Sequence, residues 1–248
     1  MPPRALSPVG VALVDKPAGP SSFAIVAALR RHTRARTGHA GTLDPFATGL
    51  LVMLSGAATR LAPCFVGLDK RYVTDIDLTS TTSTGDPEGE LLERHPAPAQ
   101  SELDAALEHL RGEVELPIPA ASAVKIGGER AYKLARRGVT VEMPLRRSLV
   151  HSLDVISYTG ESVRLALHVN SGTYVRSIAQ ALGGHCTTLR RTAVGPFDVL
   201  EAADVEHAVL LPAGETLARL TAEALDRVPA AVRAGVLALD EPTNGSAA

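Results

Sequence analysis

Apolar and polar positions alternate in a way that predicts strands in three parts of the chain. A short apolar run at residues 10–14 predicts a strand that ends at Asp15-Lys16-Pro17. Residues 71–78 alternate strictly, which predicts a half-buried strand, and a turn follows in the cluster of Thr, Ser, Gly and Asp at 79–86. The alternating positions on one face of this second predicted strand are Tyr72, Thr74, Ile76 and Leu78. The third predicted strand has Val163, Leu165, Leu167 and Val169 on one face.

Helical spacing appears in four other stretches. Ser21-Ser22 begins a helix with apolar positions that include Phe23 and Leu29, and Ser101 is predicted to cap a helix that runs to about Leu110, because Asp104 stands at the capping-box position. Another helix is predicted from about Tyr174 to Leu182, and residues 210–239 contain helical stretches interrupted at Pro229. Strands and helices mix without a strict βαβ alternation, which predicts the α+β class.

The composition is that of an ordinary globular protein. The chain has 248 residues, of which 45% are hydrophobic and 21% are charged, and this excludes a disordered, collagen-like or membrane chain. The longest mainly apolar stretch, near residues 50–54, is far shorter than the roughly 18 residues that a membrane span requires. The N-terminus lacks the apolar region of a secretory signal, and Cys64 and Cys186 fit neither a disulfide framework nor a CxxC zinc pair. A cytoplasmic location without membrane contact is therefore expected.

The net charge of -2 hides a strong segregation along the chain. Residues 1–71 carry nine basic and three acidic side chains, and residues 125–147 carry seven basic and two acidic ones. The stretch 75–115 and the tail from Asp198 onward are acidic. Two separate basic segments favour a local footprint for a polyanion. Alternatively, Arg30, Arg31, Arg34 and Arg36 are the solvated face of one helix.

The most unusual local sequence is the stretch GHAGTLDPFATG at residues 38–49. It places the carboxylate of Asp44 in a glycine-rich, otherwise uncharged loop, and Pro45 favours an extended backbone at Asp44. A second interpretation is that Asp44 caps a helix with Pro45 as its first residue, along which Phe46, Gly49, Leu50 and Met53 would lie. A catalytic role is compatible with either interpretation.

Metal and nucleotide chemistry have little support in the sequence. His39 has no partner at HxH or HxxxH spacing, so a metal site there is not expected. The chain lacks GxxxxGK[ST], a GxGxxG after a strand and a GxSxG elbow.

Ordered motifs along the chain carry a resemblance to a known family. VDKPAGPSS at 14–22 and GHAGTLDPFATGLL at 38–51 are followed by DKRY, TSTGDPEGE, PIPAASAVKIGGERAYKLARRG, SGTYVRSIAQALG and LRRTAVGPF. In this order, over about residues 10–197, the chain resembles bacterial tRNA pseudouridine-55 synthases of the TruB family. The resemblance implies the pseudouridine synthase fold, a mixed and mainly antiparallel sheet flanked by helices and loops.

The same resemblance implies a domain organisation. Residues 1–197 would form the catalytic domain, with a thumb-like insertion at about 117–147. Residues 198–248 would be a short acidic C-terminal extension, or a shortened form of the RNA-binding module that many family members carry.

In this family the enzyme isomerises uridine 55 in the T-loop of tRNA to pseudouridine, and the aspartate that matches Asp44 is the essential catalytic residue. The reaction needs no cofactor and no metal. A carboxylate can attack C1', attack C6 or take a proton from C2', and the sequence leaves these three routes open. The arginine that matches Arg176 would pair with the carboxylate and lower its pKa, which favours the ionised form.

Other residues match family positions that bind the substrate. His39 matches the histidine that fills the space left by the flipped base, and Tyr72 matches the tyrosine that stacks on the uracil. Tyr174 and Leu189 match positions that line the uracil pocket. Without the resemblance, Tyr72 would be interpreted as a half-buried strand tyrosine, and Tyr174 and Leu189 as ordinary core.

Basic side chains are the candidates for contacts with the RNA backbone. These candidates are Lys16, Arg31, Arg34, Arg36, Lys125, Arg130 and Lys133. The last three belong to the thumb-like insertion, which would close on the RNA. The expected partner is therefore tRNA, bound by its T-arm and T-loop, and the protein is expected to act as a monomer.

Two positions depart from the family pattern, and two other functions are compatible with the sequence. Glu115 stands where the family usually has Gln, and Ala121 replaces an aromatic or bulky residue before the thumb serine. One alternative function is a tRNA-binding folding chaperone with secondary or lost synthase activity. The other is an RNA glycosidase that uses a lone carboxylate, which would release free uracil.

Overall fold

The computed structural model describes residues 8–122, 124–137, 139 and 142–239. The chain forms two compact units, of which unit 1 combines residues 1–70 with residues 190–248 and unit 2 comprises residues 71–189. Strands β4 (Lys70–Asp77) and β12 (His185–Val194) carry the chain from one unit into the other. None of the described helices is long and apolar enough to cross a membrane.

Unit 1 is built on an antiparallel pair of strands. Strand β1 (Gly10–Lys16) pairs with β3 (Thr48–Ser55), from Gly10 opposite Ser55 to Lys16 opposite Gly49. The other edge of β3 pairs antiparallel with β2 (Thr37–His39), and its first residues pair parallel with Arg190 and Arg191 of β12. The short β13 (Phe197–Asp198) pairs with the end of β12. The strand predicted from the apolar run at 10–14 is confirmed.

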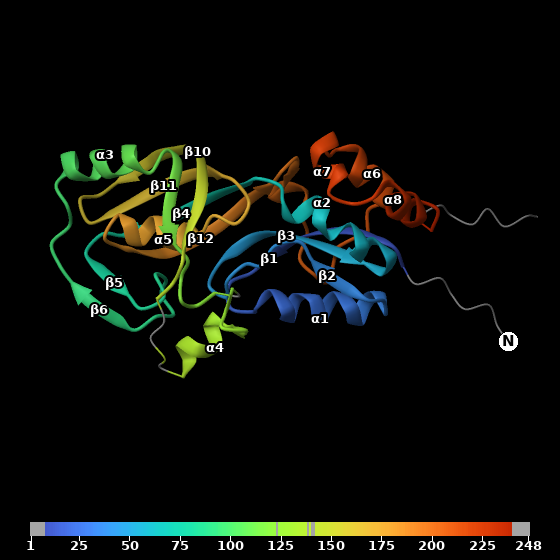
Figure 1. Ribbon diagram of the computed structural model, residues 1–248, viewed down its shortest axis with the longest axis horizontal. Helices are drawn as coiled ribbons and strands as arrows, with labels where there is room; N and C mark the ends of the chain where they lie inside the picture. The colour runs from blue at the N-terminus through green and yellow to red at the C-terminus, as the bar shows by residue number, and fades with distance from the viewer. Residues whose placement is uncertain (1–7, 123, 138, 140–141, 240–248) are drawn as a thin grey trace, which may run out of the picture. The chain divides into compact units, whose positions relative to one another are not determined.

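Helix α1 (Ser22–Thr33) begins where the sequence predicts it. The Ala24 N–H donates to the Ser21 hydroxyl at 3.2 Å, which caps the helix, and the helix ends at Arg34 in the left-handed conformation. Its buried residues Ile25 and Leu29 pack against apolar side chains of β1 and β3, so that α1 covers one face of this sheet (Figure 1). Truncation of a buried leucine such as Leu29 to alanine costs about 2–5 kcal/mol.

The C-terminal residues of unit 1 belong to its core. The 3-10 helices and the helices that cover the other face of β1 and β3 are η1 (Gly56–Leu61), α2 (Ala62–Val66), η2 (Val199–Glu201), α6 (Ala213–Ala218), α7 (Ala222–Asp226) and α8 (Ala230–Leu237). Leu217, Ala224 and Val236 are buried in one cluster with Leu54 and Phe65. The residues after 198 therefore contribute apolar side chains to unit 1. The domain boundary at residue 197 stays a prediction.

Unit 2 contains a sheet in the order β12-β4-β11-β10-β7. Its remaining strands are β7 (Gly112–Pro117), β10 (Leu145–Tyr158) and β11 (Ser162–Val169), and the hairpin of β5 (Ser80–Thr82) and β6 (Leu91–Arg94) stands apart. β10 pairs antiparallel with both β7 and β11. The predicted alternation is confirmed in β4 and β11, whose inward side chains are buried. The α+β class and the mainly antiparallel sheet are also confirmed.

Two helices pack on this sheet, and a third lies in the predicted insertion. Helix α5 (Val175–Ala181) agrees with the prediction, and its Ser177 hydroxyl donates to the Pro117 carbonyl of β7 at 2.6 Å. Helix α3 (Gln100–His109) starts earlier than predicted, because the Glu102 carboxylate accepts the Ala99 N–H at 2.8 Å. The prediction of Ser101 as the cap was therefore wrong. Within the described part of 117–147 lie β8 (Lys125–Ile126), β9 (Glu129–Arg130) and α4 (Ala131–Arg136).

Candidate active site

Asp44 lies in the loop that joins β2 to β3 in unit 1. The residues after it form strand β3 and not a helix, so the interpretation of Asp44 as a helix cap was wrong. The Ala47 N–H donates to the Asp44 carbonyl at 3.2 Å, which closes a turn, and the Asp44 side chain is half-buried. The sequence therefore places an ionisable carboxylate on a tight turn directly before a buried strand.

The Lys16 ammonium holds the loop on the C-terminal side of Asp44. Lys16 ends β1 with a wholly buried side chain, and its Nζ donates to the carbonyls of Pro45 at 3.0 Å and Ala47 at 2.6 Å. A third bond reaches the Pro17 carbonyl at 2.9 Å. An ammonium has three donors, so these three bonds match its full capacity. The structure contradicts the prediction that Lys16 contacts the RNA backbone, because this side chain does not reach the surface.

The Arg191 guanidinium holds the loop on the N-terminal side of Asp44. Arg191 is 1% exposed and donates to the carbonyls of Gly41 at 3.0 Å, Thr42 at 3.4 Å and Leu50 at 2.7 Å. Gly49 lets the backbone of β12 come this close, because a Cβ at Gly49 would lie 2.2 Å from the Arg191 carbonyl oxygen. Gly49 also has φ +103°, a conformation that favours glycine.

The first turn of α1 attaches to the same loop. The buried Ser22 hydroxyl donates to the Leu43 carbonyl and accepts the Leu43 N–H, each at 2.9 Å. The residue before Asp44 is therefore bonded through both of its backbone groups. Together, Lys16, Arg191 and Ser22 fix the backbone on both sides of Asp44 by side chains that are themselves buried.

His39 lies at the end of β2 and contacts an exposed aromatic ring. Its imidazole is 5.4 Å from the ring of Phe23 between centroids, at an interplanar angle of 73°. Its Nδ1 is buried without a hydrogen-bond partner among the described residues. Burial lowers the pKa of His39 below its usual value, and the positive charge of Arg191 lowers this pKa further. His39 is therefore neutral at physiological pH.

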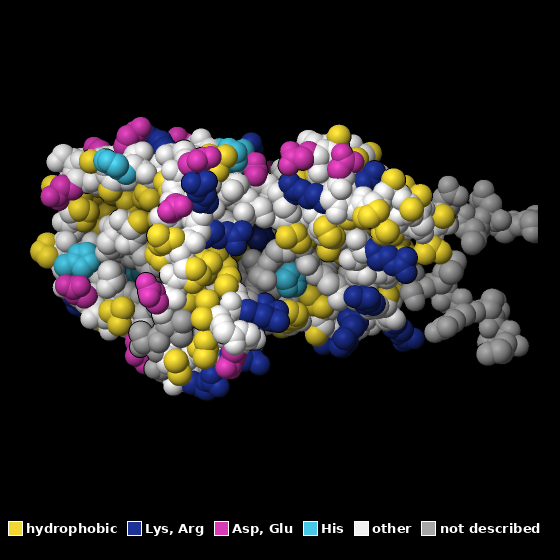
Figure 2. Space-filling view, in the orientation of Figure 1, with side chains coloured by type: hydrophobic (Ala, Val, Ile, Leu, Met, Phe, Trp, Pro, Cys, Tyr) yellow, Lys and Arg dark blue, Asp and Glu magenta, His cyan; other side chains and the backbone are white. Residues whose placement is uncertain are grey.

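The other basic candidates of unit 1 are on its surface. Arg31 in α1, together with Arg34 and Arg36 after it, is exposed. Figure 2 shows dark-blue side chains gathered over α1. This exposure is compatible both with a polyanion footprint and with the solvated face of one helix, so contact of these guanidinium groups with RNA stays a prediction.

Lys70 is a second buried cation close to the charge of Arg191. Its Nζ donates to the carbonyl of Val66 at 2.6 Å and to that of Leu68. Burial and the Arg191 charge lower the pKa of Lys70 to about 7, although Asp69 acts in the opposite direction. A substantial fraction of Lys70 is therefore neutral near pH 7.

In unit 2 the candidate Arg176 is buried and paired with a carboxylate. Arg176 is 2% exposed, and its Nη1 lies 3.2 Å from an oxygen of Asp86 and donates to the Thr84 carbonyl at 2.8 Å. The Asp86 carboxylate also accepts the Thr84 hydroxyl at 2.5 Å and the Glu88 N–H at 3.0 Å. Asp86 thus fixes both the Arg176 guanidinium and the turn at 82–89. The predicted pairing of Asp44 with Arg176 stays a prediction.

The remaining substrate-binding candidates also lie in unit 2. Tyr72 of β4 is 9% exposed and Leu189 of β12 is 6% exposed, whereas Tyr174 is half-buried at the cap of α5. These positions are compatible with core residues and with the edge of a pocket. Their roles in binding uracil stay predictions.

The thumb-like insertion presents its basic candidates to solvent. Lys125 in β8, Arg130 in β9 and Lys133 in α4 are exposed. Of the two departures from the family pattern, Glu115 pairs with Arg147 across β7 and β10 at 3.3 Å. Ala121 contributes its carbonyl, which accepts the Arg176 Nη2 at 2.9 Å, so this contact does not depend on the Ala121 side chain.

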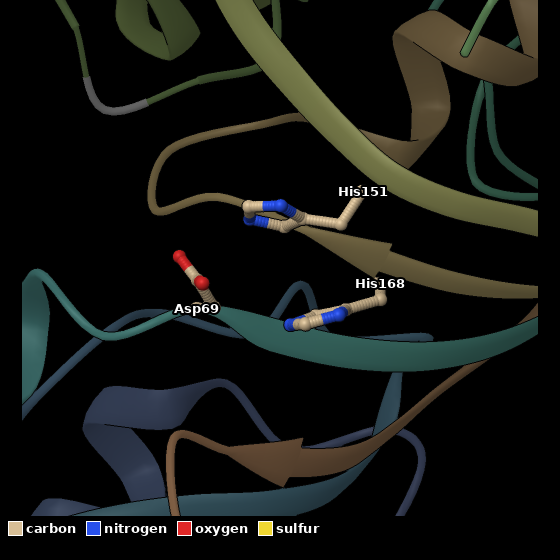
Figure 3. Close-up of side chains that lie close together, drawn as sticks. All are labelled: Asp69, His151 and His168. Carbon is tan, nitrogen blue, oxygen red and sulfur yellow. The ribbon is translucent and has the colours of Figure 1, made fainter. Parts of the chain in front are cut away.

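Two imidazoles lie side by side on neighbouring strands of unit 2. His151 of β10 and His168 of β11 have ring centroids 4.5 Å apart, and a nitrogen of one lies within 4.8 Å of a nitrogen of the other. In Figure 3 the two rings face each other. The pairing register between β10 and β11 shifts between Val150 and Ser152, so His151 is the extra residue of a β-bulge beside His168.

Sequence reasoning did not single out Arg191, Lys70 or Asp86. Arg191 is two positions from the buried Leu189 and two from the buried Ala193 in β12. Because side chains two positions apart in a strand point to the same face, Arg191 is on the inward face. A charged residue at an inward position was the signal for a structural cation. Asp86 had no comparable signal, because Asp is common in turns with or without a buried partner.

A model of the family described as "TruB family pseudouridylate synthase (N terminal domain)" matches residues 30–175. The proteins named tRNA pseudouridine synthase B from Azoarcus sp. (strain BH72) and Thermobifida fusca (strain YX) are 36% and 45% identical to this chain. The alignments cover 92% and 80% of this chain and 73% of each relative.

Solved structures provide a second comparison. A chain of the structure titled "Crystal Structure of a Cbf5-Nop10-Gar1 Complex" is 30% identical, with a TM-score of 0.57. A chain of "Crystal structure of the archaeal box H/ACA sRNP Nop10-Cbf5 complex" is 26% identical, also with a TM-score of 0.57. The matches cover 76% and 83% of this chain, which spans about half the length of those chains, 50% and 54%.

Proposed function

The chain belongs to the TruB family of pseudouridylate synthases, and from this membership we propose that it converts uridine 55 in the T-loop of tRNA to pseudouridine. The observation that carries the proposal is the loop of Asp44, whose backbone is held on both sides by the buried Lys16 and Arg191. Family membership also supports the pseudouridine synthase fold, and it is the ground for proposing a cytoplasmic monomer.

The reaction rearranges one bond and needs no second substrate. The bond between uracil N1 and ribose C1' breaks, the uracil rotates, and a bond forms between C5 and C1'. N1 gains a proton and C5 loses one to solvent, so atoms and electrons balance. Release of the C5 hydrogen therefore measures the reaction directly.

Asp44 is the catalytic carboxylate in this proposal. Attack at C1', attack at C6 and removal of the C2' proton each need an ionised carboxylate in a fixed position. The hydrogen bonds of Lys16, Arg191 and Ser22 to the loop support this role, because they fix the backbone before the substrate arrives. Protonation of Asp44 would stop all three routes.

The motif positions give the other residues their proposed roles. Tyr72, Tyr174 and Leu189 bind the flipped uracil, and Arg176 favours the ionised form of Asp44. The fixed guanidinium of Arg176, bonded to Asp86 and two carbonyls, supports a role that requires a positioned charge. His39 fills the space from which the base is extruded, and its neutral state suits a position inside a base stack.

Basic side chains on both units bind the RNA backbone in this proposal. Arg31, Arg34 and Arg36 are exposed in unit 1, and Lys125, Arg130 and Lys133 are exposed in unit 2. Their contacts give affinity that falls with salt, and the shape of the T-loop gives selectivity. The substrate is therefore the T-arm of tRNA.

The test uses a T-arm stem-loop RNA labelled with tritium at uracil C5. The full chain and an Asp44→Asn variant are incubated with this RNA, and released tritium and the modified nucleoside are measured. We expect release by the wild type, pseudouridine at the T-loop position, and no detectable release by Asp44→Asn with unchanged RNA affinity.

Two other results would contradict the proposal. Binding of full-length tRNA without tritium release would assign the chain to RNA binding, as a folding chaperone requires. Free uracil among the products would show glycosidase chemistry, because an isomerase retains the base.

A further inference from the structure

Phe23 is an aromatic side chain that the fold leaves in solvent. It is 73% exposed in the first turn of α1, whereas Phe65 and Phe197 of the same unit are wholly buried. The neighbours Ser21 and Ser22 cap the helix and bond to Leu43, so the backbone at Phe23 is fixed by groups other than its ring. The core of unit 1 does not explain an aromatic residue at this position.

The ring of Phe23 is partly oriented by His39. The two rings meet edge to face, with centroids 5.4 Å apart and an interplanar angle of 73°. His39 ends strand β2, from which the loop to Asp44 begins, and Ser22 bonds to the residue before Asp44. Phe23 therefore lies at the end of α1 that is attached to the loop of Asp44.

The charges along α1 and directly after it favour an anionic partner. Helix α1 has no acidic residue in its first turn and carries Arg30 and Arg31 in its last turn, and Arg34 and Arg36 follow it. An exposed aromatic ring on a helix whose other end carries cations can bind single-stranded nucleic acid, because the ring stacks on a base while the cations contact phosphates further along the strand.

We propose that Phe23 is a nucleobase-binding residue whose exposed ring stacks on an unpaired base of the bound RNA, next to the position that His39 occupies. The inference rests on the proposed function and adds a contact to a second base. Stacking on a base is sequence-tolerant, since every base has a π-face, so Phe23 adds affinity for an open loop without selecting one nucleotide.

The first experiment measures the affinity of the T-arm stem-loop for Phe23→Ala, Phe23→Leu and Phe23→Trp. We expect Phe23→Ala and Phe23→Leu to bind about tenfold more weakly and Phe23→Trp to bind like the wild type, because leucine keeps the apolar surface but lacks the π-face. The matched control is Leu200→Ala, which removes another apolar side chain of unit 1 that is 91% exposed and should not change the affinity.

Salt dependence and stability separate stacking from other causes. The slope of log affinity against log salt should be unchanged in Phe23→Leu, whereas Arg31→Ala should reduce it by about one. The melting temperature of Phe23→Leu should match the wild type, because a ring this exposed contributes little to the core. A 2-aminopurine placed at single loop positions should be quenched by the wild type at one position, and less so by Phe23→Leu.

The results distinguish this inference from the proposed function. Equal RNA affinity of Phe23→Leu and the wild type would overturn the stacking role, while tritium release by the wild type would leave the synthase proposal intact. Absence of tritium release with a tenfold loss in Phe23→Leu would contradict the synthase but keep the base contact.

Discussion

Each unit contains a buried arginine, and the two are neutralised in different ways. Arg176 in unit 2 pairs with the buried carboxylate of Asp86 and donates to carbonyls. Arg191 in unit 1 donates to three carbonyls, and no carboxylate pairs with it among the described residues. One charge is thus compensated by an opposite charge, and the other only by backbone dipoles.

Two titratable groups in unit 1 are affected by the charge of Arg191. Burial lowers the pKa of both His39 and Lys70, and the charge of Arg191 lowers each pKa further. The low dielectric of the interior screens a buried charge poorly, so the Arg191 charge adds to the effect of burial on both groups. The comparison teaches that a buried cation can hold a loop and also add to the pKa shifts that burial causes in the groups around it.

The largest expected effect on the free energy of unfolding comes from removal of the Asp86 carboxylate in unit 2. Asp86→Ala leaves Arg176 buried without this counterion and removes the acceptor of the Thr84 hydroxyl and the Glu88 N–H. We expect the free energy of unfolding to fall by about 3–5 kcal/mol, measured by urea denaturation of the full chain.

Glu223→Ala is the matched control for this variant. It breaks another pair of arginine and carboxylate, with Arg227 at 3.1 Å, but the Glu223 side chain is 86% exposed. The expected loss is about 0–1 kcal/mol. Equal losses for the two variants would contradict the conclusion that Asp86 neutralises a buried charge.

The second prediction concerns the arginine without a carboxylate. Arg191→Met leaves the carbonyls of residues 41, 42 and 50 without this donor, which costs about 1–3 kcal/mol, and removal of a buried charge offsets part of that cost. We expect a smaller loss of stability than in Asp86→Ala, together with reduced tritium release. A loss as large as that of Asp86→Ala would contradict the proposed difference between the two arginines.

Most of the fold could be predicted from periodicity. Strands β4 and β11 and helices α1 and α5 follow from alternation, apolar spacing and capping residues. The cap of α3 was misplaced by two residues, because the N-cap residue is Ala99, whose side chain gives no capping signal, and the Glu102 carboxylate makes the capping bond instead. The strand after Asp44 was ambiguous, since a short apolar run suits a strand or a helix.

The candidate site could be predicted only in part. Asp44, His39 and the exposed arginines follow from local sequence and family motifs. The role of Lys16 was misinterpreted, because a lysine near a loop usually faces solvent, and only the tertiary structure shows its three carbonyl partners. Likewise, the pairing of Asp86 with Arg176 joins residues 90 positions apart, a separation that no local pattern encodes.

The third prediction concerns the pKa of Lys70, which depends on burial and on the charge of Arg191 in unit 1. The folded state lowers the Lys70 pKa to about 7, so between pH 7 and the unfolded value of 10.5 the unfolded chain binds more protons. The free energy of unfolding of the wild type minus that of Lys70→Met should therefore rise by about 2 kcal/mol from pH 7 to pH 9. Below pH 7 this difference should stay nearly constant. Urea denaturation of both proteins at each pH measures this difference.

The Arg191→Met background supplies the control for Lys70. Loss of the Arg191 charge should raise the Lys70 pKa. The difference in free energy of unfolding between Arg191→Met and the double variant with Lys70→Met should then change less between pH 7 and pH 9. A pH dependence that is the same in both backgrounds would show that burial alone shifts the Lys70 pKa.

The smallest expected effect is on His39. Burial first and the Arg191 charge second lower its pKa below 6.5, so this histidine makes the fold less stable as the pH falls from 6.5 through the folded-state pKa. Titration of the imidazole by NMR should give a pKa below 6.5 in the wild type and a higher one in Arg191→Met. The half-exposed Arg190, which pairs with Asp15 at 2.7 Å, provides the matched control, and Arg190→Met should leave the His39 pKa unchanged. If both variants shifted that pKa equally, the effect would come from net charge, and the buried position of Arg191 would not be its cause.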